Sequence, residues 1–349
     1  MAKRTISYRD AGVDIDGNTR WVKRIQSAMG TTHGPRVINR PGAFAGLFQL
    51  NGRGRRYRDP VLVGCADGVG SKTLLGVQQN RLYGLGIDLV AMNVNDLITC
   101  GAEPLFFLDY LAVHSIRLDR LGVLIEGMAD GCRQAGCALL GGETAEMPDL
   151  YERDHVDLGG FAVGVVEKGA AIGPDDVRTG DVLVGLPSSG VHANGYSLIR
   201  KLLKTRRLRP NARIADTDQT AMETLLEPTR IYVGPVMAAL RGSRTAGAIR
   251  SMAHITGGGL PENVGRALHR KCDAVIDTGS WSPPAIFSAI ESAGVDGNEM
   301  FRVFNMGIGF VLIVAPTGVD SVLRSLRRNG QKPVVIGHVQ PGRGRVQLR

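Results

Sequence analysis

A carboxylate, two glycines, a hydroxyl and a lysine stand close together in residues 67–72, directly after the apolar run 60–66. A carboxylate can bind Mg²⁺, glycines let backbone N–H groups approach a phosphate, and a lysine neutralises phosphate oxygens. The spacing is not that of a Walker loop. The pattern predicts a site for a metal-bound phosphate, with a strand and an ordinary glycine turn as the alternative. The candidate residues are Asp67, Gly68, Gly70, Ser71 and Lys72.

Two further polar residues, Asn93 and Asp96, interrupt an apolar stretch that predicts a helix over 87–99. They are three residues apart and share a helical face. A buried carboxylate is costly unless it is paired or bound to a metal, so Asp96 belongs either to a hydrogen-bond network or to a ligand site. Glu143 and Thr144 follow a predicted strand at 137–140, and ligands collect at strand ends in open α/β sheets. Asp67, Asp96 and Glu143 are therefore the candidate Mg²⁺ ligands, with Asn93 and Thr144 beside the nucleotide.

Three consecutive glycines follow a histidine in the second half of the chain. They precede a predicted helix that Pro261 opens, so their N–H groups lie near its positive end and form an anion site. The histidine enters this turn and is the candidate for proton transfer, with a structural histidine at a strand end as the alternative. The candidate residues are His254, Thr256, Gly257, Gly258 and Gly259.

The loop 188–195 has the same character. Its hydroxyls and N–H groups could bind a substrate phosphate, while a plain loop ending in an N-cap at Asn194 explains the sequence equally well. The candidate substrate-binding residues are Ser188, Ser189, His192 and Asn194.

The bulk composition places limits on the class of protein. The chain has 349 residues, 43% of them hydrophobic, and a formal charge of +9. No apolar run is long enough for a transmembrane helix, and no secretory signal is evident, so we expect a cytoplasmic protein with no membrane partner. The arginines are not interleaved with aromatics, so no nucleic-acid partner is expected. The five scattered cysteines are typical of reduced thiols.

Strand-like and helix-like segments alternate along the chain and must position these groups. Helices are predicted at 87–99, Leu118–Ala135, 195 onward, 261 onward, 285–293 and 321–328. Strands are predicted at 105–113, 137–140, 161–166, 181–186, 252–255, 274–276, Ile308–Val314 and 333–336. The aperiodic segment 168–180 predicts a boundary between domain 1–168 and domain 169–349. The fold class expected is α/β (α+β) with two domains.

Taken together, these motifs resemble the phosphoribosylformylglycinamidine cyclo-ligase (aminoimidazole ribonucleotide synthetase) family. The resemblance runs from Tyr8 to the C-terminus through the stretches 8–15, 67–72, 86–97, 101–110, 141–148, 192–198, 228–232, 254–259 and 305–309. It implies a ligase of purine biosynthesis that converts ATP and formylglycinamidine ribonucleotide into aminoimidazole ribonucleotide, ADP and phosphate. It also implies a homodimer in which strands of the N-terminal domains build a shared barrel.

The resemblance implies roles for the candidate residues. Asp67, Asp96 and Glu143 would hold Mg²⁺ and the triphosphate of ATP, with Lys72 near the phosphates. His254, with Asp96, would be catalytic and lie nearest the formyl group, and the loop with Ser188 and Asn194 would hold the substrate. The sequence departs from the family at Gln26 and in a flap at 42–48 that is poorer in glycine. A selenophosphate synthetase-like enzyme and a non-catalytic nucleotide-binding regulator are the alternatives.

Overall fold

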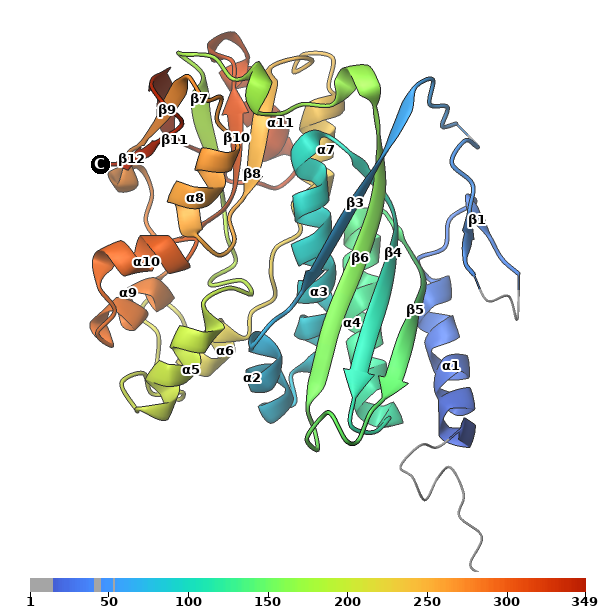
Figure 1. Cartoon of the computed structure of the whole chain (residues 1–349). Coiled ribbons are helices and arrows are strands. Elements are labelled where there is room, and N and C mark those ends of the chain that lie inside the picture. Colours follow the sequence, from blue (N-terminus) through green and yellow to red (C-terminus); the bar gives the residue numbers. More distant parts are fainter. Residues whose placement is uncertain (1–14, 41–44, 53) are drawn as a thin grey trace, which may run out of the picture.

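The structure, a computed structural model, describes residues 15–40, 45–52 and 54–349. Two large β-sheets with helices packed against them organise the chain (Figure 1). A third, two-stranded sheet pairs β1 (Val37–Ile38) with β2 (Leu47–Phe48). The mixed α/β class predicted from the sequence is confirmed. The motif at 8–14 and part of the flap at 42–48 lie outside the described residues, so those predictions stay untested.

The N-terminal sheet is mixed and has four strands in the order β3-β6-β4-β5. β6 is antiparallel to both β3 and β4, whereas β4 and β5 are parallel and are joined through α4. The strands are β3 (Pro60–Gly68), β4 (Glu103–Val113), β5 (Ala138–Glu146) and β6 (Val156–Glu167).

Helices α3 (Leu82–Leu97) and α4 (Leu118–Ala135) pack against each other and cover one face of this sheet. Gly127 allows them to approach each other closely, because a Cβ atom at this position would collide with the carbonyl oxygen of Tyr83. Helix α1 (Ile15–Gly30) lies beside β5 and α4 at the sheet edge (Figure 1).

The opposite face of the N-terminal sheet carries large apolar side chains in contact with solvent. Leu62 on β3 is 64% exposed, Phe161 on β6 is 50% exposed and Tyr110 on β4 is 41% exposed. The strand register puts these three side chains on one face, because Ala66 pairs with Phe161 and Tyr110 pairs with Gly159. Within the described residues, no helix covers this face in Figure 1.

The C-terminal sheet has six strands in the order β12-β9-β11-β7-β10-β8. Its pairs are antiparallel except β12 with β9. The strands are β7 (Val182–Pro187), β8 (Ile249–His254), β9 (Cys272–Ile276), β10 (Ile308–Val314), β11 (Val334–Pro341) and β12 (Val346–Leu348). The helices are α5 (Tyr196–Lys204), α6 (Ala221–Leu225), α7 (Val233–Arg241), α8 (Gly259–Arg266), α9 (Ala285–Ser292), α10 (Gly297–Val303) and α11 (Val319–Arg328).

The largest hydrophobic core runs across both halves of the chain. Leu89 and Val94 of α3 belong to the same buried cluster as Leu186 of β7, Tyr232 and Phe310 of β10. Because the core is continuous, the two sheets have a fixed relative position. No helix in the described part of the chain is both long and apolar enough to cross a membrane.

The structure differs from the predicted elements at several boundaries. α4 has the predicted bounds, but α3 begins at Leu82 rather than at 87. β5 continues to Glu146, so Glu143 and Thr144 lie within the strand instead of after it, because β5 keeps pairing with β4. The division of the chain at 168 stays a prediction, although the strands of the two sheets fall on either side of it.

Candidate functional site

A histidine of the C-terminal sheet meets a carboxylate of the N-terminal helix layer. His254 Nδ1 lies 2.8 Å from Oδ1 of Asp96, which is on α3. The His254 side chain is 1% exposed and that of Asp96 is 45% exposed, so the pair reaches from the interior to solvent. His254 Nε2 is buried and has no hydrogen-bond partner. The carboxylate thus orients the imidazole and leaves Nε2 as the nitrogen that can exchange a proton with a bound molecule.

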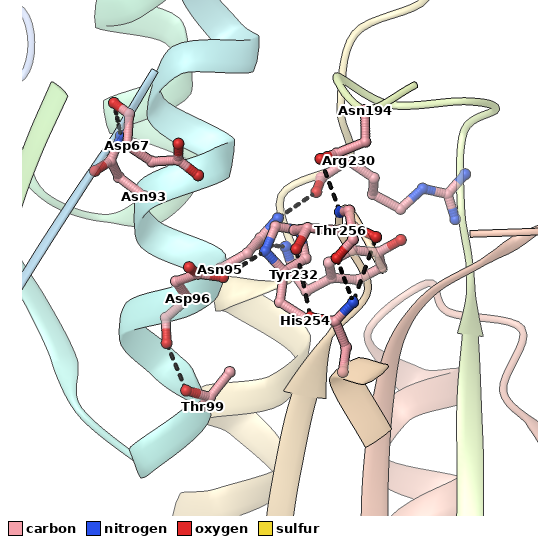
Figure 2. A network of polar contacts seen from close by, with 12 residues as sticks. Asp67, Asn93, Asn95, Asp96, Thr99, Asn194, Arg230, Tyr232, His254 and Thr256 are labelled. Carbon is pink, nitrogen blue, oxygen red and sulfur yellow. Dashed lines mark hydrogen bonds and ion pairs between the residues drawn. The ribbon is translucent and has the colours of Figure 1, made fainter. Parts of the chain in front are cut away.

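Asp67 lies at the end of β3, where its Oδ1 accepts a hydrogen bond from the Gly68 N–H at 2.7 Å. Burial raises the pKa of Asp67 and the negative charge of Asp96 raises it further, against the lowering effects of that N–H and of His254. Asn93 donates to the Asp67 carbonyl at 3.2 Å, and its own Oδ1 is buried without a partner. Figure 2 shows Asp67 and Asn93 on one side of the network and His254 on the other.

A cation here would reduce the repulsion between the carboxylates of Asp67 and Asp96. It would also give the buried Asn93 Oδ1 a partner. Carboxylate and amide oxygens are the ligands that Mg²⁺ prefers. Asp67 at the end of β3, with Asn93 and Asp96 on α3, thus has the ligand chemistry of the expected metal site.

Glu143 does not join this group within the chain. In the sheet register, Asp67 pairs with Gly160, Gly160 with Asp109, and Asp109 with Gly142. Three strand spacings amount to about 14 Å. Among the described residues, no three His, Cys, Asp or Glu side chains form a group that could hold a metal. The expected three-carboxylate site is therefore not assembled by these side chains as they stand.

Glu143 and Thr144 instead line a separate cavity of about 240 Å³ between α1, α4 and β5. Trp21 lies in its wall and donates from Nε1 to the Thr144 hydroxyl at 2.9 Å. Asp109 also lines this cavity, and burial raises the pKa of its carboxyl to about 7. The predicted nucleotide residues thus divide into one group near Asp67 and another beside α1.

Lys72 is not directed toward a ligand. Its side chain is fully buried, and Nζ donates to Asp88 and to the backbone carbonyls of His192 and Glu227. An ammonium group has three donors, and these contacts use all of them. The structure therefore does not bring Lys72 to a phosphate position and corrects that expectation.

The other residues of the 67–72 motif shape the turn. Gly70 has φ +66°, a conformation that favours glycine, and its carbonyl accepts from the Thr73 N–H at 3.1 Å. Ser71 lies at the N-cap of α2 (Lys72–Gln78) without a side-chain cap bond, and its Oγ is 3.4 Å from Oγ of Ser197. Gly68 closes β3 opposite Gly159.

The loop 188–194 makes mostly internal contacts. Ser188 Oγ is buried and lies 2.8 Å from the Gly190 carbonyl oxygen, and Ser189 Oγ donates to the Pro228 carbonyl at 2.6 Å. His192 is buried with φ +64°, and burial lowers its pKa well below the usual range. The hydrogen bonds of these three side chains are made within the protein and hold the loop in shape, and His192 Nδ1 is buried without a partner, so their role in substrate binding stays a prediction.

The predicted cap at Asn194 is wrong, because α5 begins after an N-cap at Gly195 that has no side-chain cap bond. Asn194 Oδ1 instead accepts from the Gly257 N–H at 2.9 Å and joins the two predicted substrate loops. Its Nδ2 is buried without a partner.

The glycine turn after His254 opens α8, which begins at Gly259, so that Pro261 lies in its first turn as predicted. Gly258 and Gly259 have φ +92° and +60°, so side chains are disfavoured at both positions. Asn263 fixes the turn from inside α8 by donating to the carbonyls of Thr256, Gly257 and Gly259.

A cleft of about 390 Å³ lies between the two sheets and contains both members of the His254–Asp96 pair. β3 contributes Cys65, and α8 contributes Asn263 and Arg266. Burial, with the negative charges of Asp96 and Asp67, raises the pKa of Cys65 to about 12, so this thiol stays protonated. The cleft thus contains the Asp96 carboxylate, which is a candidate metal ligand, the imidazole of His254, and the positively charged side chain of Arg266.

Three residues important to this arrangement were not assigned roles from the sequence. Asn95 accepts from the Tyr232 N–H at 2.9 Å and donates to the Arg230 carbonyl at 2.8 Å (Figure 2). Asp88 binds Lys72 inside the protein, and Asn263 anchors the glycine turn. Polar residues in an apolar helix were the available signal for Asp88 and Asn95, but the partners of these two lie far away in the sequence. The partners of Asn263 lie within seven positions of it.

Solved structures of similar fold include a kinase and a hydrogenase maturation protein. The thiamine-monophosphate kinase from Stenotrophomonas maltophilia matches with a TM-score of 0.68 at 20% identity over 94% of this chain and 95% of that chain. The hydrogenase maturation protein HypE, in complex with ATP, matches with a TM-score of 0.64 at 16% identity over 94% of this chain and 90% of that chain. At these identities the likeness shows a shared fold.

The sequence itself matches two family models. The N-terminal domain of AIR synthase related protein matches residues 55–166, and the C-terminal domain of the same family matches residues 178–349. A curated phosphoribosylformylglycinamidine cyclo-ligase from Trichlorobacter lovleyi is 48% identical over 342 residues, which are 97% of this chain and 96% of the relative. The chain therefore belongs to the phosphoribosylformylglycinamidine cyclo-ligase family.

Proposed function

We propose that this protein closes the imidazole ring of aminoimidazole ribonucleotide, using formylglycinamidine ribonucleotide and ATP and releasing ADP and phosphate. The observation that carries the proposal is the His254–Asp96 pair in the cleft between the sheets of a chain from this family. The activity is a ligase reaction of purine biosynthesis.

Ring closure requires a formyl oxygen that is activated as a leaving group and an acceptor for the proton that the attacking nitrogen loses. The formyl oxygen of an amide is a poor leaving group, and phosphoryl transfer from ATP converts it into a good one. The amidine nitrogen then attacks the formyl carbon, the ring closes and phosphate leaves. His254 Nε2 accepts the proton that the attacking nitrogen loses, while Asp96 holds Nδ1 and stabilises the imidazolium.

Mg²⁺ is proposed at the end of β3, where it would neutralise charge on the phosphates of ATP. Asp67 and Asp96 would hold it, with the Asn93 side-chain oxygen close by. The Gly257–Gly259 turn lies at the start of α8. The Gly257 N–H is bonded to Asn194 and the Gly259 N–H to the Thr256 carbonyl, so a phosphate of the ribonucleotide would bind there mainly through the positive end of the helix. Asn194 supports that turn from the neighbouring loop.

The direct test is to incubate the protein with ATP, Mg²⁺ and formylglycinamidine ribonucleotide and to measure aminoimidazole ribonucleotide and ADP. His254→Asn is expected to lower kcat by about 10²- to 10⁴-fold. His338→Asn, on an exposed position of β11, is the matched control and should retain activity. ADP without the imidazole product would favour a superfamily kinase, and ATP binding without turnover would favour the nucleotide-binding regulator.

We also propose a homodimer formed through the open face of the N-terminal sheet. The exposed side chains of Leu62, Tyr110 and Phe161 support it, because apolar patches of this kind usually mark an interface. Phe161→Glu should shift the mass measured by analytical ultracentrifugation from dimer to monomer. A monomeric wild-type protein would contradict the proposal, and Val335→Glu on exposed β11 is the control.

A further inference from the structure

The buried ion pair between Lys72 and Asp88 lies outside the proposed chemistry. Nζ is 2.8 Å from Oδ2 and 3.0 Å from Oδ1, and neither side chain is exposed. Burial lowers the pKa of Lys72, and the charge of Asp88 opposes this effect. Moving two charges out of water costs free energy, and an apolar pair would fill the same space without that cost. A buried ion pair therefore indicates a specific role in the protein besides packing.

The other hydrogen bonds of the pair all reach the C-terminal half of the chain. Lys72, on α2, donates to the carbonyl of His192 at 2.9 Å and to that of Glu227 at 2.8 Å. Asp88, on α3, accepts from Thr229 N–H at 2.7 Å and from Thr229 Oγ1 at 2.6 Å. Through this one ion pair, α2 and α3 are thus hydrogen-bonded to the loop that contains His192 and to the segment that contains Glu227 and Thr229.

One of the two carbonyl groups that accept from Lys72, that of His192, belongs to a residue in a rare backbone conformation. His192 has φ +64°, which non-glycine residues seldom adopt, so its loop depends on contacts that hold it. Two residues later, Asn194 binds the Gly257 N–H of the glycine turn that follows His254. A short series of contacts therefore connects Lys72 to the turn proposed to bind the ribonucleotide.

We propose that Lys72 and Asp88 are positioning residues that fix the loop at 188–194 and the segment at 227–232, and so set the affinity for the ribonucleotide substrate and not for ATP. This inference rests on the proposed function, because it concerns the turn proposed there to bind the ribonucleotide. Lys72 has no donor left for a phosphate, which separates this role from direct nucleotide binding.

The test compares the KM values for both substrates in three variants. Lys72→Met removes the donor to His192, and the KM for the ribonucleotide is expected to rise about 10- to 100-fold while the KM for ATP changes by less than about threefold. Thr229→Val keeps the ion pair but removes one bond to Asp88, and a rise of about three- to tenfold in the same KM is expected. Lys201→Met, exposed on α5, is the control for the lysine change.

The double variant Lys72→Met with Asp88→Asn separates stability from positioning. It leaves no unpaired buried charge, so its melting temperature should recover toward that of the wild type. The KM for the ribonucleotide should stay high, because the His192 carbonyl still lacks its donor. If Lys72→Met does not fold, the double variant and Thr229→Val give the same comparison.

Two results would overturn the inference. A KM for ATP that rises as much as that for the ribonucleotide would place Lys72 at the phosphates. A lower melting temperature with both KM values unchanged would make the pair a contact that only stabilises the fold. Failure of the wild-type protein to form aminoimidazole ribonucleotide is a separate outcome, and it would contradict the proposed function instead.

Discussion

Replacing Asp109 with asparagine is expected to stabilise the protein, and to do so more at pH 8 than at pH 5. Asp109 lies on β4, is 9% exposed and lines the cavity that contains Trp21. Burial raises the pKa of its carboxyl from 3.8 to about 7, and the negative charge of Glu143 acts in the same direction. The native state therefore favours the protonated carboxyl, whereas the unfolded chain ionises at much lower pH.

The size of the effect follows from the two pKa values. A carboxyl whose pKa is raised by folding does not lower the free energy of unfolding below its unfolded pKa. It lowers that free energy increasingly as the pH rises, and the full cost is reached above the native pKa. At pH 8 the carboxylate is charged in both states, and the shift costs about 4 kcal/mol. At pH 5 the native carboxyl is still protonated, and the cost is about 2 kcal/mol. Asparagine has nearly the same shape and removes the charge, so both costs disappear.

Urea unfolding at the two pH values measures this difference for the wild type and for Asp109→Asn. The stability gained by the variant should be larger at pH 8 by about 3 kcal/mol, with unchanged m-values. Asp149→Asn, in an exposed loop, serves as the control and should change neither value. An equal gain at both pH values would refute the reasoning, because it would show that the Asp109 carboxyl does not titrate between them in the native state.

Three further predictions concern stability. Glu103→Gln should destabilise the protein by about 2 kcal/mol, because three guanidinium groups converge on this carboxylate. Urea unfolding measures the loss, which high salt should reduce. Gly127→Ala should cost about 2 kcal/mol or more, because its Cβ would collide with the Tyr83 carbonyl, and an unchanged melting temperature would contradict this. Backbone N–H groups hold the pKa of Asp273 below 3.8, so its contribution is present above that value and lost as the pH falls through the native pKa. The protection factor of the Arg343 amide against hydrogen exchange should therefore fall only below pH 3.8, and a protection factor already lost at pH 6 would count against it.

Local sequence signals predicted elements well where they were long and regular. α4 begins and ends as predicted because its apolar period is clear and Gly136, with φ +68°, ends it. α2 was not predicted, since it has seven residues and its N-cap residue, Ser71, makes no side-chain cap bond. A helix of that length carries too little periodicity for the sequence to reveal it.

Long-range contacts set the limit for the candidate site. His254 and Asp96 were both recognisable as residues that could carry chemistry, but they are 158 positions apart and only the packing of β8 on α3 joins them. Lys72 shows the converse case. Its motif suits a phosphate, yet its partners are carbonyls 120 and 155 positions away, and no local pattern reports where a distant carbonyl points.

Helix α3 explains why both halves of the site depend on one segment. Asp88 and Asn95 are seven residues apart, which places them within about 20° of each other on the helix, and both bind the segment 227–232. Asn93 points to the other side, where it meets the Asp67 carbonyl, and Asp96 turns toward His254.

Asn93 and Asp96 were predicted to share one face of this helix, but their side chains contact two different neighbours. Asn93 contacts Asp67 and Asp96 contacts His254. A helix buried on all sides can keep polar residues only where each finds its own partner. Substitutions along α3 should accordingly separate by position. Changes at Asp88 or Asn95 should raise the KM for the ribonucleotide, and a change at Asn93 should alter the Mg²⁺ dependence. A change at Asp96 should alter both the Mg²⁺ dependence and the rate of ring closure, because Asp96 is proposed to hold the metal and also to orient His254.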